Sequence, residues 1–199
     1  RILRLHPDER LQLRLQQLEA QLTTKNVLGA LMDRVPHYCS GCPHNISTKV
    51  PQGSRALAGI GCHYMAAWIY PQTQTFSQMG GEGVAWIGQA PFTTTKHVFA
   101  NLGDGTYFHS GILAIRAAVA AKVQMTYKIL YNDAVAMTGG QPVDGILTVP
   151  QITQQLAAEG VKRIAVVTDE PEKYASVTDL AEGVPVLHRD DMEKLQKEL

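Results

Sequence analysis

The chain has 199 residues, of which 45% are hydrophobic and 18% are charged, and its formal net charge is zero. A chain of this length can enclose one sizeable core, and it contains neither an apolar run of about 18 residues nor a signal peptide, so we expect a cytoplasmic protein that does not enter a membrane. Zero net charge argues against nucleic acid as a partner, and three cysteines without a secretory signal favour a reducing compartment.

The N-terminal segment predicts one amphipathic helix. In residues 7–23, PDERLQLRLQQLEAQLT, four leucines recur with helical spacing and polar residues occupy the other face. We therefore expect residues 1–34 to form a helical lead-in to a second domain over residues 35–199. The chain starts at Arg1 rather than at a methionine and ends at Leu199 inside a segment of helical composition, so we expect it to be part of a larger chain.

The rest of the sequence alternates strand and helix patterns. Residues 35–55 are rich in Pro, Gly, Ser, Asn and Cys and predict a loop, and apolar segments of strand or helix type follow it. Strands are predicted at 56–61, 97–103, 125–131, 161–169 and 185–189, and helices at 81–90, 110–122, 149–160 and 190–199. This order predicts an α/β fold with a mainly parallel sheet that is flanked by helices on both faces.

Two polar residues follow predicted strands at the point where each strand ends. Asp104 lies in GDGTYFHSG after one strand, and Asn132 lies in YNDAVAMTGGQ after the next. Ligands of such sheets bind beyond the carboxyl ends of the strands, so the two side chains converge if the strands are neighbours. Carboxylate and amide oxygens suit Mg²⁺, and N–H groups around Gly105, Thr106 and Ser110 could receive a phosphate. The residues thus predict a magnesium–diphosphate site, whereas a GDG triplet alone is also a common tight turn.

The spacing of these residues resembles a known cofactor motif. Between Gly105 and Asn132 lie 26 residues that contain a predicted helix and a predicted strand, and this resembles the motif of thiamine diphosphate enzymes. The block from about residue 38 to residue 170 is similar to the thiamine-diphosphate-binding domain of indolepyruvate ferredoxin oxidoreductase, of the 2-oxoacid:ferredoxin oxidoreductase family, in its long fused bacterial form. The resemblance is carried by YCSGCPHN, GIGCHYMA, MGGEGVAWIGQAPF, NLGDGTYFHSG and AMTGGQPVDG.

The resemblance implies roles for the matching positions. Asp104 and Asn132 would ligate Mg²⁺ through their side chains, and Ala134 would do so through its backbone carbonyl. The thiamine diphosphate itself would be contacted by residues of three segments, namely Gly61, Cys62, Gly103, Gly105, Thr106, Asn132, Ala136 and Met137. The MGGEG stretch (79–83) would lie near the thiazolium ring, with no role assigned to a single residue.

Two further residues near this site have alternative interpretations. Asp133 could be functional or a solvated loop carboxylate beside the metal, and His109 could be a catalytic acid or base or a structural hydrogen-bonding residue. Thiamine activation also requires a glutamate on the aminopyrimidine ring. In the family it resembles, this glutamate belongs to a separate domain, and we cannot place it in this sequence.

The implied activity is the oxidative decarboxylation of a 2-oxo acid to an acyl-CoA, with electrons passed to an iron–sulfur cluster and on to ferredoxin. Resemblance favours an aryl pyruvate such as indolepyruvate as substrate, with branched-chain 2-oxo acids as an alternative. The expected partners are the 2-oxo acid, coenzyme A, ferredoxin and the remaining domains of the same enzyme, which we expect to be a homo-oligomer when intact.

This chain alone would be inactive. The alternatives are a non-redox thiamine-dependent decarboxylase and a zinc-stabilised binding module with a degenerate thiamine site.

The three cysteines, Cys39, Cys42 and Cys62, are one short of a four-thiolate site. Spacing alone leaves three interpretations: inert buried thiols, a zinc site with one histidine, or three ligands of a [4Fe–4S] cluster. The histidines that could complete a zinc site are His37, His44 and His63. The resemblance implies the [4Fe–4S] cluster, with a fourth cysteine expected beyond residue 199.

Overall fold

The computed structural model describes residues 9–29, 35–145 and 147–199. It divides the chain into two compact units, Arg1–Pro36 and His37–Leu199. The first unit contains helix α1 (Glu9–Gly29), which includes the described part of the helix predicted over 7–23 and continues beyond it. The leucines of the predicted apolar stripe have exposed side chains, namely Leu11, Leu15, Leu18 and Leu22. Residues 1–8 and 30–34 of the predicted lead-in lie outside the described residues.

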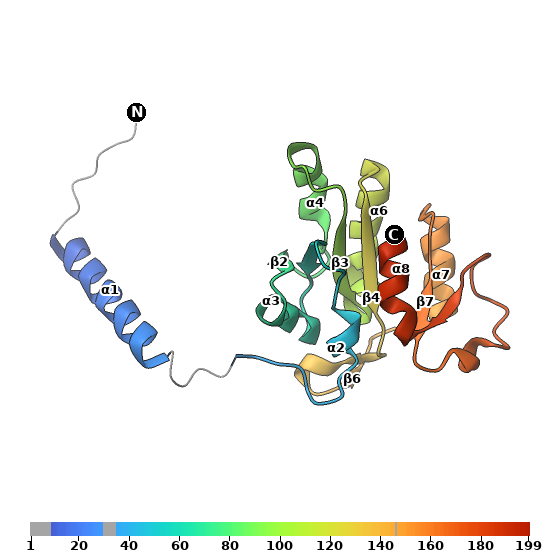
Figure 1. Cartoon of the computed structure of the whole chain (residues 1–199), viewed down its shortest axis with the longest axis horizontal. Coiled ribbons are helices and arrows are strands. Elements are labelled where there is room, and N and C mark those ends of the chain that lie inside the picture. Colours follow the sequence, from blue (N-terminus) through green and yellow to red (C-terminus); the bar gives the residue numbers. More distant parts are fainter. Residues whose placement is uncertain (1–8, 30–34, 146) are drawn as a thin grey trace. The chain divides into compact units, whose positions relative to one another are not determined.

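The second unit is built around a four-stranded parallel sheet with the strand order β2–β1–β3–β4 (Figure 1). The strands are β1 (Ala56–Ala58), β2 (Thr73–Phe76), β3 (Val98–Gly103) and β4 (Met125–Leu130). Five of the six residues of β3 are buried, as expected for the inner strand of a parallel sheet that is covered on both faces. The sequence does not predict β2, because this edge strand buries only Thr73 and therefore lacks an apolar run.

Helices cover both faces of this sheet, which confirms the predicted α/β fold. Helices α4 (Val84–Gln89), α6 (Ile112–Ala121) and α7 (Val149–Ala158) pack on one face. They form the core with apolar residues of the sheet: Leu57, Trp86, Val98, Ala100, Leu102, Tyr107, Ile115, Ile152 and Leu156. Tyr127 of β4 packs against this core, so its neighbour Lys128 points to the opposite face. There Lys128 binds Gln196 of α8 (Met192–Glu198).

Short elements fill the connections between the long ones. The predicted loop 35–55 contains the short helix α2 (His44–Ser47), and α3 (Ala66–Ile69) and α5 (Asp104–Thr106) are single helical turns. Strands β5 (Ala134–Val135) and β6 (Gln141–Pro142) form a small antiparallel pair. Further tight turns span Cys62–Met65, Ala90–Phe92, Tyr107–Gly111, Ala136–Thr138, Pro171–Tyr174 and Arg189–Asp191. Among the described helices, none is both long and apolar enough to cross a lipid bilayer.

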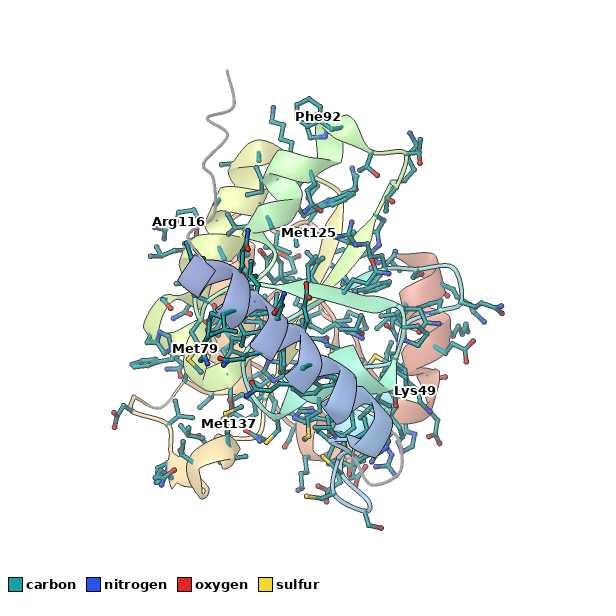
Figure 2. The ribbon with its side chains drawn as sticks, turned by 90° about the vertical axis from the view of Figure 1, so that its left-hand side faces the viewer. Lys49, Met79, Phe92, Arg116, Met125 and Met137 are labelled. Carbon is teal, nitrogen blue, oxygen red and sulfur yellow. The ribbon has the colours of Figure 1, made fainter. Side chains whose placement is uncertain are left out.

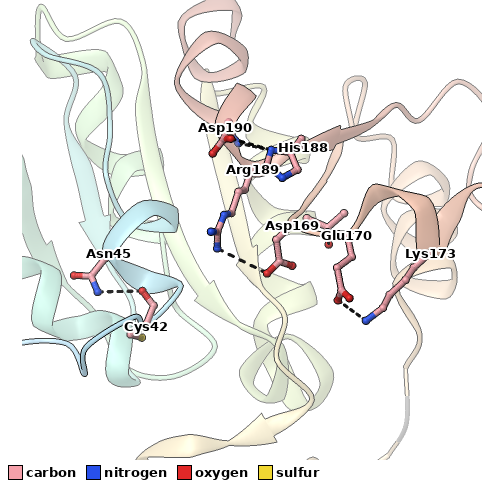
Figure 3. A network of polar contacts seen from close by, with 9 residues as sticks. Cys42, Asn45, Asp169, Glu170, Lys173, His188, Arg189 and Asp190 are labelled. Carbon is pink, nitrogen blue, oxygen red and sulfur yellow. Dashed lines mark hydrogen bonds and ion pairs between the residues drawn. The ribbon is translucent and has the colours of Figure 1, made fainter.

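The C-terminal strands differ from the prediction. Of the strand predicted over 161–169, the structure keeps only β7 (Val166–Thr168), which pairs in parallel with β8 (Val186–His188) in a separate two-stranded sheet. The prediction of a long buried strand is wrong because Val161 and Ile164 pack against the core around Leu102 instead of continuing the strand. An ion pair of 3.7 Å between Arg189 and Asp169 joins the ends of β7 and β8 (Figure 3).

Lys128 connects three segments on the second face of the sheet. Its Nζ donates hydrogen bonds to the backbone carbonyl of Lys49 at 2.8 Å and to Oε1 of Gln196 at 3.2 Å. The same ammonium group lies 5.4 Å from the centre of the Phe99 ring. Because its side chain is buried, the pKa of Lys128 falls to about 7. This residue therefore holds α8 and the segment after α2 against the sheet.

The lowered pKa predicts a pH-dependent stability. Above about pH 7 the folded protein releases the Lys128 proton, whereas the unfolded chain keeps it up to the ordinary pKa of 10.5. The free energy of unfolding should therefore rise between these two pKa values, by at most about 1.4 kcal/mol per pH unit from this group. In urea denaturation across this range, Lys128→Met should remove that part of the slope, and replacement of the exposed Lys162 should not. Equal slopes for the native protein and Lys128→Met would contradict the prediction.

Candidate functional site

The predicted site begins where β3 ends. Strands β3 and β4 pair in register up to Gly103 and Leu130, so the residues that follow them leave the sheet side by side. Asp104 is buried, and its Oδ2 accepts hydrogen bonds from the backbone N–H groups of Asn132 at 2.9 Å and Asp133 at 2.6 Å. Its Oδ1 accepts one from the N–H of Gly105 at 2.9 Å. The structure thus brings Asp104 and Asn132 together as the sequence predicts.

The loop from Asn132 to Ala134 has a backbone geometry that serves this contact. Asp133 has a φ of 54°, in the left-handed region that Asp and Asn tolerate better than most residues. This turn directs two successive N–H groups toward the Asp104 carboxylate. The side-chain Oδ1 of Asn132 accepts a hydrogen bond of 3.2 Å from the N–H of Ala134.

The oxygen atoms at this turn fit a hard divalent cation. Oδ1 of Asp104 and Oδ1 of Asn132 each accept one hydrogen bond, so each keeps a lone pair for a metal. One carboxylate, one amide oxygen and a backbone carbonyl are the few protein ligands that Mg²⁺ takes when phosphate and water complete its coordination. The chemistry of the donor set therefore agrees with Mg²⁺ beside a diphosphate.

The chain that follows Asn132 folds over the GDG turn. A Cβ added to Gly105 would lie 3.8 Å from Val143 and 3.9 Å from Val135, so the loop covers this glycine closely. A small pocket at this point is lined by Asp104, Phe108, Tyr131, Asp133, Val143, Gly145, Leu147 and Ile152. Within the described residues, Ala136 and Met137 are not part of this lining and lie on an exposed turn. In Figure 2, Met137 lies in the lower left part of the view.

The segment after β1 lies beside the same turn. The imidazole of His63 fills a space bounded by three glycines. A Cβ would lie 2.7 Å from the nearest ring atom if added to Gly59, 2.5 Å if added to Gly61, and 3.4 Å if added to Gly103. The His63 side chain is 4% exposed, and in the described part of the chain its Nε2 has no hydrogen-bond partner. Burial, followed by the charge of His44, lowers the pKa of His63 to about 4, so the ring is neutral near pH 7. The segment with Gly61 and Cys62, which the resemblance assigns to the cofactor, is therefore next to the GDG turn.

This close approach predicts a severe effect of one methyl group. A Cβ at Gly59 would lie 2.3 Å from the backbone oxygen of Asn101. Neither backbone can move freely, because Gly59 directly follows the buried strand β1 and Asn101 lies within the buried strand β3. We expect Gly59→Ala to lower the free energy of unfolding by roughly 1–3 kcal/mol or more. Gly88→Ala is the matched control, since nothing lies within 4 Å of its Cβ and α4 should gain up to about 1 kcal/mol. Thermal unfolding of the two variants measures the contrast, and equal stability would contradict it.

The glycine-rich stretch 79–83 places a carboxyl group inside the protein. Glu82 is fully buried, and its Oε2 accepts a hydrogen bond of 2.7 Å from the N–H of Gly80. Its backbone carbonyl accepts one of 2.8 Å from the hydroxyl of Tyr127. Burial raises the pKa of Glu82, and the N–H groups of Glu82, Gly80 and Ile60 and the charge of His109 act in the opposite direction. Sequence reasoning assigns no role to Glu82, although an acid within a glycine run is the signal that marks it.

His109 lies in the segment that directly follows the GDG turn. It is exposed, and it belongs to a π-helical turn, Tyr107–Gly111, that connects α5 with α6. Such turns are frequent at functional sites. Its Nδ1 shares a hydrogen bond of 2.6 Å with Oγ of Ser110, which leaves Nε2 as the nitrogen open to a ligand.

The cysteines lie on two segments that contact each other. Cys39 is exposed, Cys42 and Cys62 are half-buried, and all three are free thiols. The hydroxyl of Tyr38, the residue before Cys39, donates to the carbonyl of His63 at 3.3 Å. The CxxC turn is closed by a hydrogen bond of 3.0 Å from the backbone N–H of Cys42 to the carbonyl of Cys39. Nδ2 of Asn45 donates a further hydrogen bond of 3.1 Å to the carbonyl of Cys42 (Figure 3).

Within the part of the chain that the structure describes, these groups form no site for a single metal ion. In the described ranges, no three side chains of His, Cys, Asp or Glu gather at one point where they could hold a metal ion. His63, one of the histidines considered for zinc, is buried among glycines, and Nδ1 of His44 is bonded to Oγ of Ser47 at 3.2 Å. The three thiols remain candidate ligands for a larger group, because an iron–sulfur cluster binds its cysteines at separate iron atoms.

The fold and the GDG turn together define the class of protein. Residues 59–199 match the family described as the thiamine pyrophosphate enzyme, C-terminal TPP binding domain. The match covers more than half of the chain, and the chain therefore belongs to this family.

Among curated proteins, the chain is similar to the indolepyruvate oxidoreductase subunit IorA of three archaea. It is 28% identical to the subunit of Pyrococcus horikoshii and 29% identical to that of Pyrococcus abyssi, over 82% of this chain and 30% of each relative. It is 28% identical to the subunit of Methanothermobacter thermautotrophicus over 57% of this chain and 20% of the relative. The chain thus spans less than a third of the length of these relatives.

Proposed function

We propose that this chain is the thiamine-diphosphate-binding domain of a 2-oxoacid:ferredoxin oxidoreductase of the indolepyruvate type, in its fused bacterial form, with residues 35–199 as the cofactor domain. The proposal rests mainly on the Asp104 carboxylate, which lies at the end of β3 against the backbone of Asn132 and Asp133. Membership of the thiamine pyrophosphate family supports the cofactor, and the similarity to IorA supports the reaction.

The residues around the GDG turn would divide the binding of the cofactor among them. Asp104, Asn132 and the carbonyl of Ala134 would hold Mg²⁺. Backbone groups of two loops would receive the diphosphate, and the segment after β1 would line the ring system; these residues are Gly61, Cys62, Gly103, Gly105, Thr106, Ala136 and Met137. Thiamine diphosphate supplies, when bound, the nucleophilic carbon and the electron sink for decarboxylation.

The protein groups contribute orientation and a path for electrons. The buried Asp104 would orient the metal, and the loop that carries Val143 packs over Gly105. Cys39, Cys42 and Cys62 would hold three corners of a [4Fe–4S] cluster, and the residue after Cys62 already packs against Gly103. The closeness of the Cys62 segment to the GDG turn supports direct electron transfer from the cofactor to the cluster. Coenzyme A, ferredoxin and the remaining domains would complete the reaction.

The decisive experiment uses the full-length enzyme that contains this chain, purified without oxygen. With indolepyruvate and coenzyme A, we expect reduction of ferredoxin that requires both thiamine diphosphate and Mg²⁺. Release of CO₂ without electron transfer would instead identify a non-redox decarboxylase. Bound zinc without any affinity for thiamine diphosphate would identify a binding module. Comparison of indolepyruvate with branched-chain 2-oxo acids, as relative kcat/KM, would then define the substrate class.

A further inference from the structure

The side chain of His63 lies where a cysteine segment meets the GDG turn. His63 directly follows Cys62, and its ring is buried. Cε1 of the ring would lie 2.5 Å from a Cβ added to Gly61 and 3.4 Å from one added to Gly103, the residue before Asp104. A side chain on Gly61 would overlap the ring and one on Gly103 would touch it, so the ring lies directly against both segments.

The segment with the other two cysteines packs against the same residue. The hydroxyl of Tyr38, the neighbour of Cys39, donates a hydrogen bond of 3.3 Å to the backbone carbonyl of His63. The ring of His44, two residues after Cys42, lies edge to face with the His63 ring at 5.9 Å between the ring centres. His63 therefore contacts both cysteine segments as well as the GDG turn.

The way in which the ring is held indicates what it contributes. Among the described residues, no group forms a hydrogen bond with the buried Nε2 of His63. A buried nitrogen without a hydrogen bond lowers stability, so this nitrogen does not anchor the ring. The ring instead contributes its volume, which separates the segments around it. Because protein interiors are close-packed, removal of that volume should shift or loosen these segments.

We infer that His63 is a positioning residue whose ring is the spacer that sets the separation between the cysteine segments and the GDG turn. The inference rests on the proposed function, in which the cysteine segments bind the [4Fe–4S] cluster and the GDG turn binds thiamine diphosphate. The part of a protein in cofactor chemistry is to orient the reacting groups, and electron transfer between two bound groups slows as their separation grows. The spacer therefore controls how fast electrons reach the cluster.

The first test requires neither cofactor nor turnover. Hydrogen–deuterium exchange of the full-length protein, measured by peptide mass spectrometry, shows how firmly each segment is held. In His63→Ala we expect exchange to rise by about tenfold or more in the peptides over 38–45, 59–65 and 101–106, while the peptide over 149–158 keeps its native rate. His63→Leu, which refills most of the space, should restore slow exchange in all three peptides.

The control and the contradicting outcomes of this test are equally specific. His188→Ala removes a half-exposed imidazole that is paired with Asp190 at 3.3 Å, and it should leave the three peptides at their native rates. An increase in His63→Ala that is confined to 59–65, an equal increase over 149–158, or no recovery in His63→Leu would overturn the inference.

The second test measures the electron transfer itself. Full-length enzyme, reconstituted without oxygen with iron, sulfide, thiamine diphosphate and Mg²⁺, is mixed rapidly with indolepyruvate, and electron paramagnetic resonance of frozen samples follows the reduced cluster. In His63→Ala we expect its formation to slow by about tenfold or more, and His63→Leu should recover most of the native rate. Transfer at the native rate in His63→Ala would overturn the inference. If the native enzyme forms no reduced cluster, the proposed function is wrong, and the exchange measurement still decides whether His63 is the spacer.

Discussion

Replacement of Asp104 should abolish Mg²⁺-dependent binding of thiamine diphosphate by the full-length enzyme. The carboxylate is the single charged ligand of the proposed metal site, and it also anchors the Asn132 loop through hydrogen bonds to the N–H groups of Asn132 and Asp133. Loss of an outer partner of a metal ligand already costs roughly 10–100-fold in affinity. We therefore expect Asp104→Asn to weaken the binding by at least about 100-fold, as measured by calorimetry with and without Mg²⁺.

The choice of variant decides what this experiment shows. Asp104→Ala would leave the N–H groups of Gly105, Asn132 and Asp133 without the acceptor that holds the loop, so reduced binding could follow from loss of the loop structure. Asp104→Asn keeps one acceptor oxygen and the shape of the side chain, and it removes the charge that Mg²⁺ needs. Asp169→Asn makes the same chemical change near β8 and should leave the affinity unchanged. Native affinity in Asp104→Asn would exclude this metal site.

The convergence at the GDG turn could be predicted because it follows from local pattern and one rule of topology. The apolar runs that become β3 and β4 are long, and neighbouring parallel strands end at the same edge of a sheet. Given that β3 and β4 are neighbours, Asp104 and Asn132 must lie close together. Helix α6 was equally predictable, since its own apolar residues lie nearly all round the helix. Such a helix is expected to be buried in the core.

Other parts of the site depend on contacts between distant segments, which no local pattern records. The burial of Glu82 results from the packing of Gly80 on Ser110 and from the Tyr127 hydroxyl, three segments that are far apart in sequence. The position of His63 follows from three glycines on two loops. For the same reason β7 was predicted too long. Val161 and Ile164 would be apolar in a strand as well, and only the folded core shows that they pack against it rather than extend β7.

Each single replacement of Cys39, Cys42 or Cys62 by serine should remove the iron–sulfur cluster from the full-length enzyme. Three thiolates fill three of the four positions that such a cluster requires, and a protein oxygen is a poor substitute for a thiolate on iron. We expect the native protein, purified without oxygen, to contain about four iron atoms and four sulfides per chain, and the variants to lose most of both. The broad visible absorption of the cluster should disappear in parallel.

Two comparisons separate the loss of the cluster from a general loss of structure. Thiamine diphosphate binding should survive in Cys39→Ser, because Cys39 is exposed and lies outside the core of the sheet. Ferredoxin reduction should nevertheless fall to background in this variant, since electrons from decarboxylation would have no first acceptor. His37→Ala, on the same exposed loop, should keep the iron; a protein that contains zinc instead, and loses it in His37→Ala, would show that these cysteines hold a structural metal and that the electron path lies elsewhere.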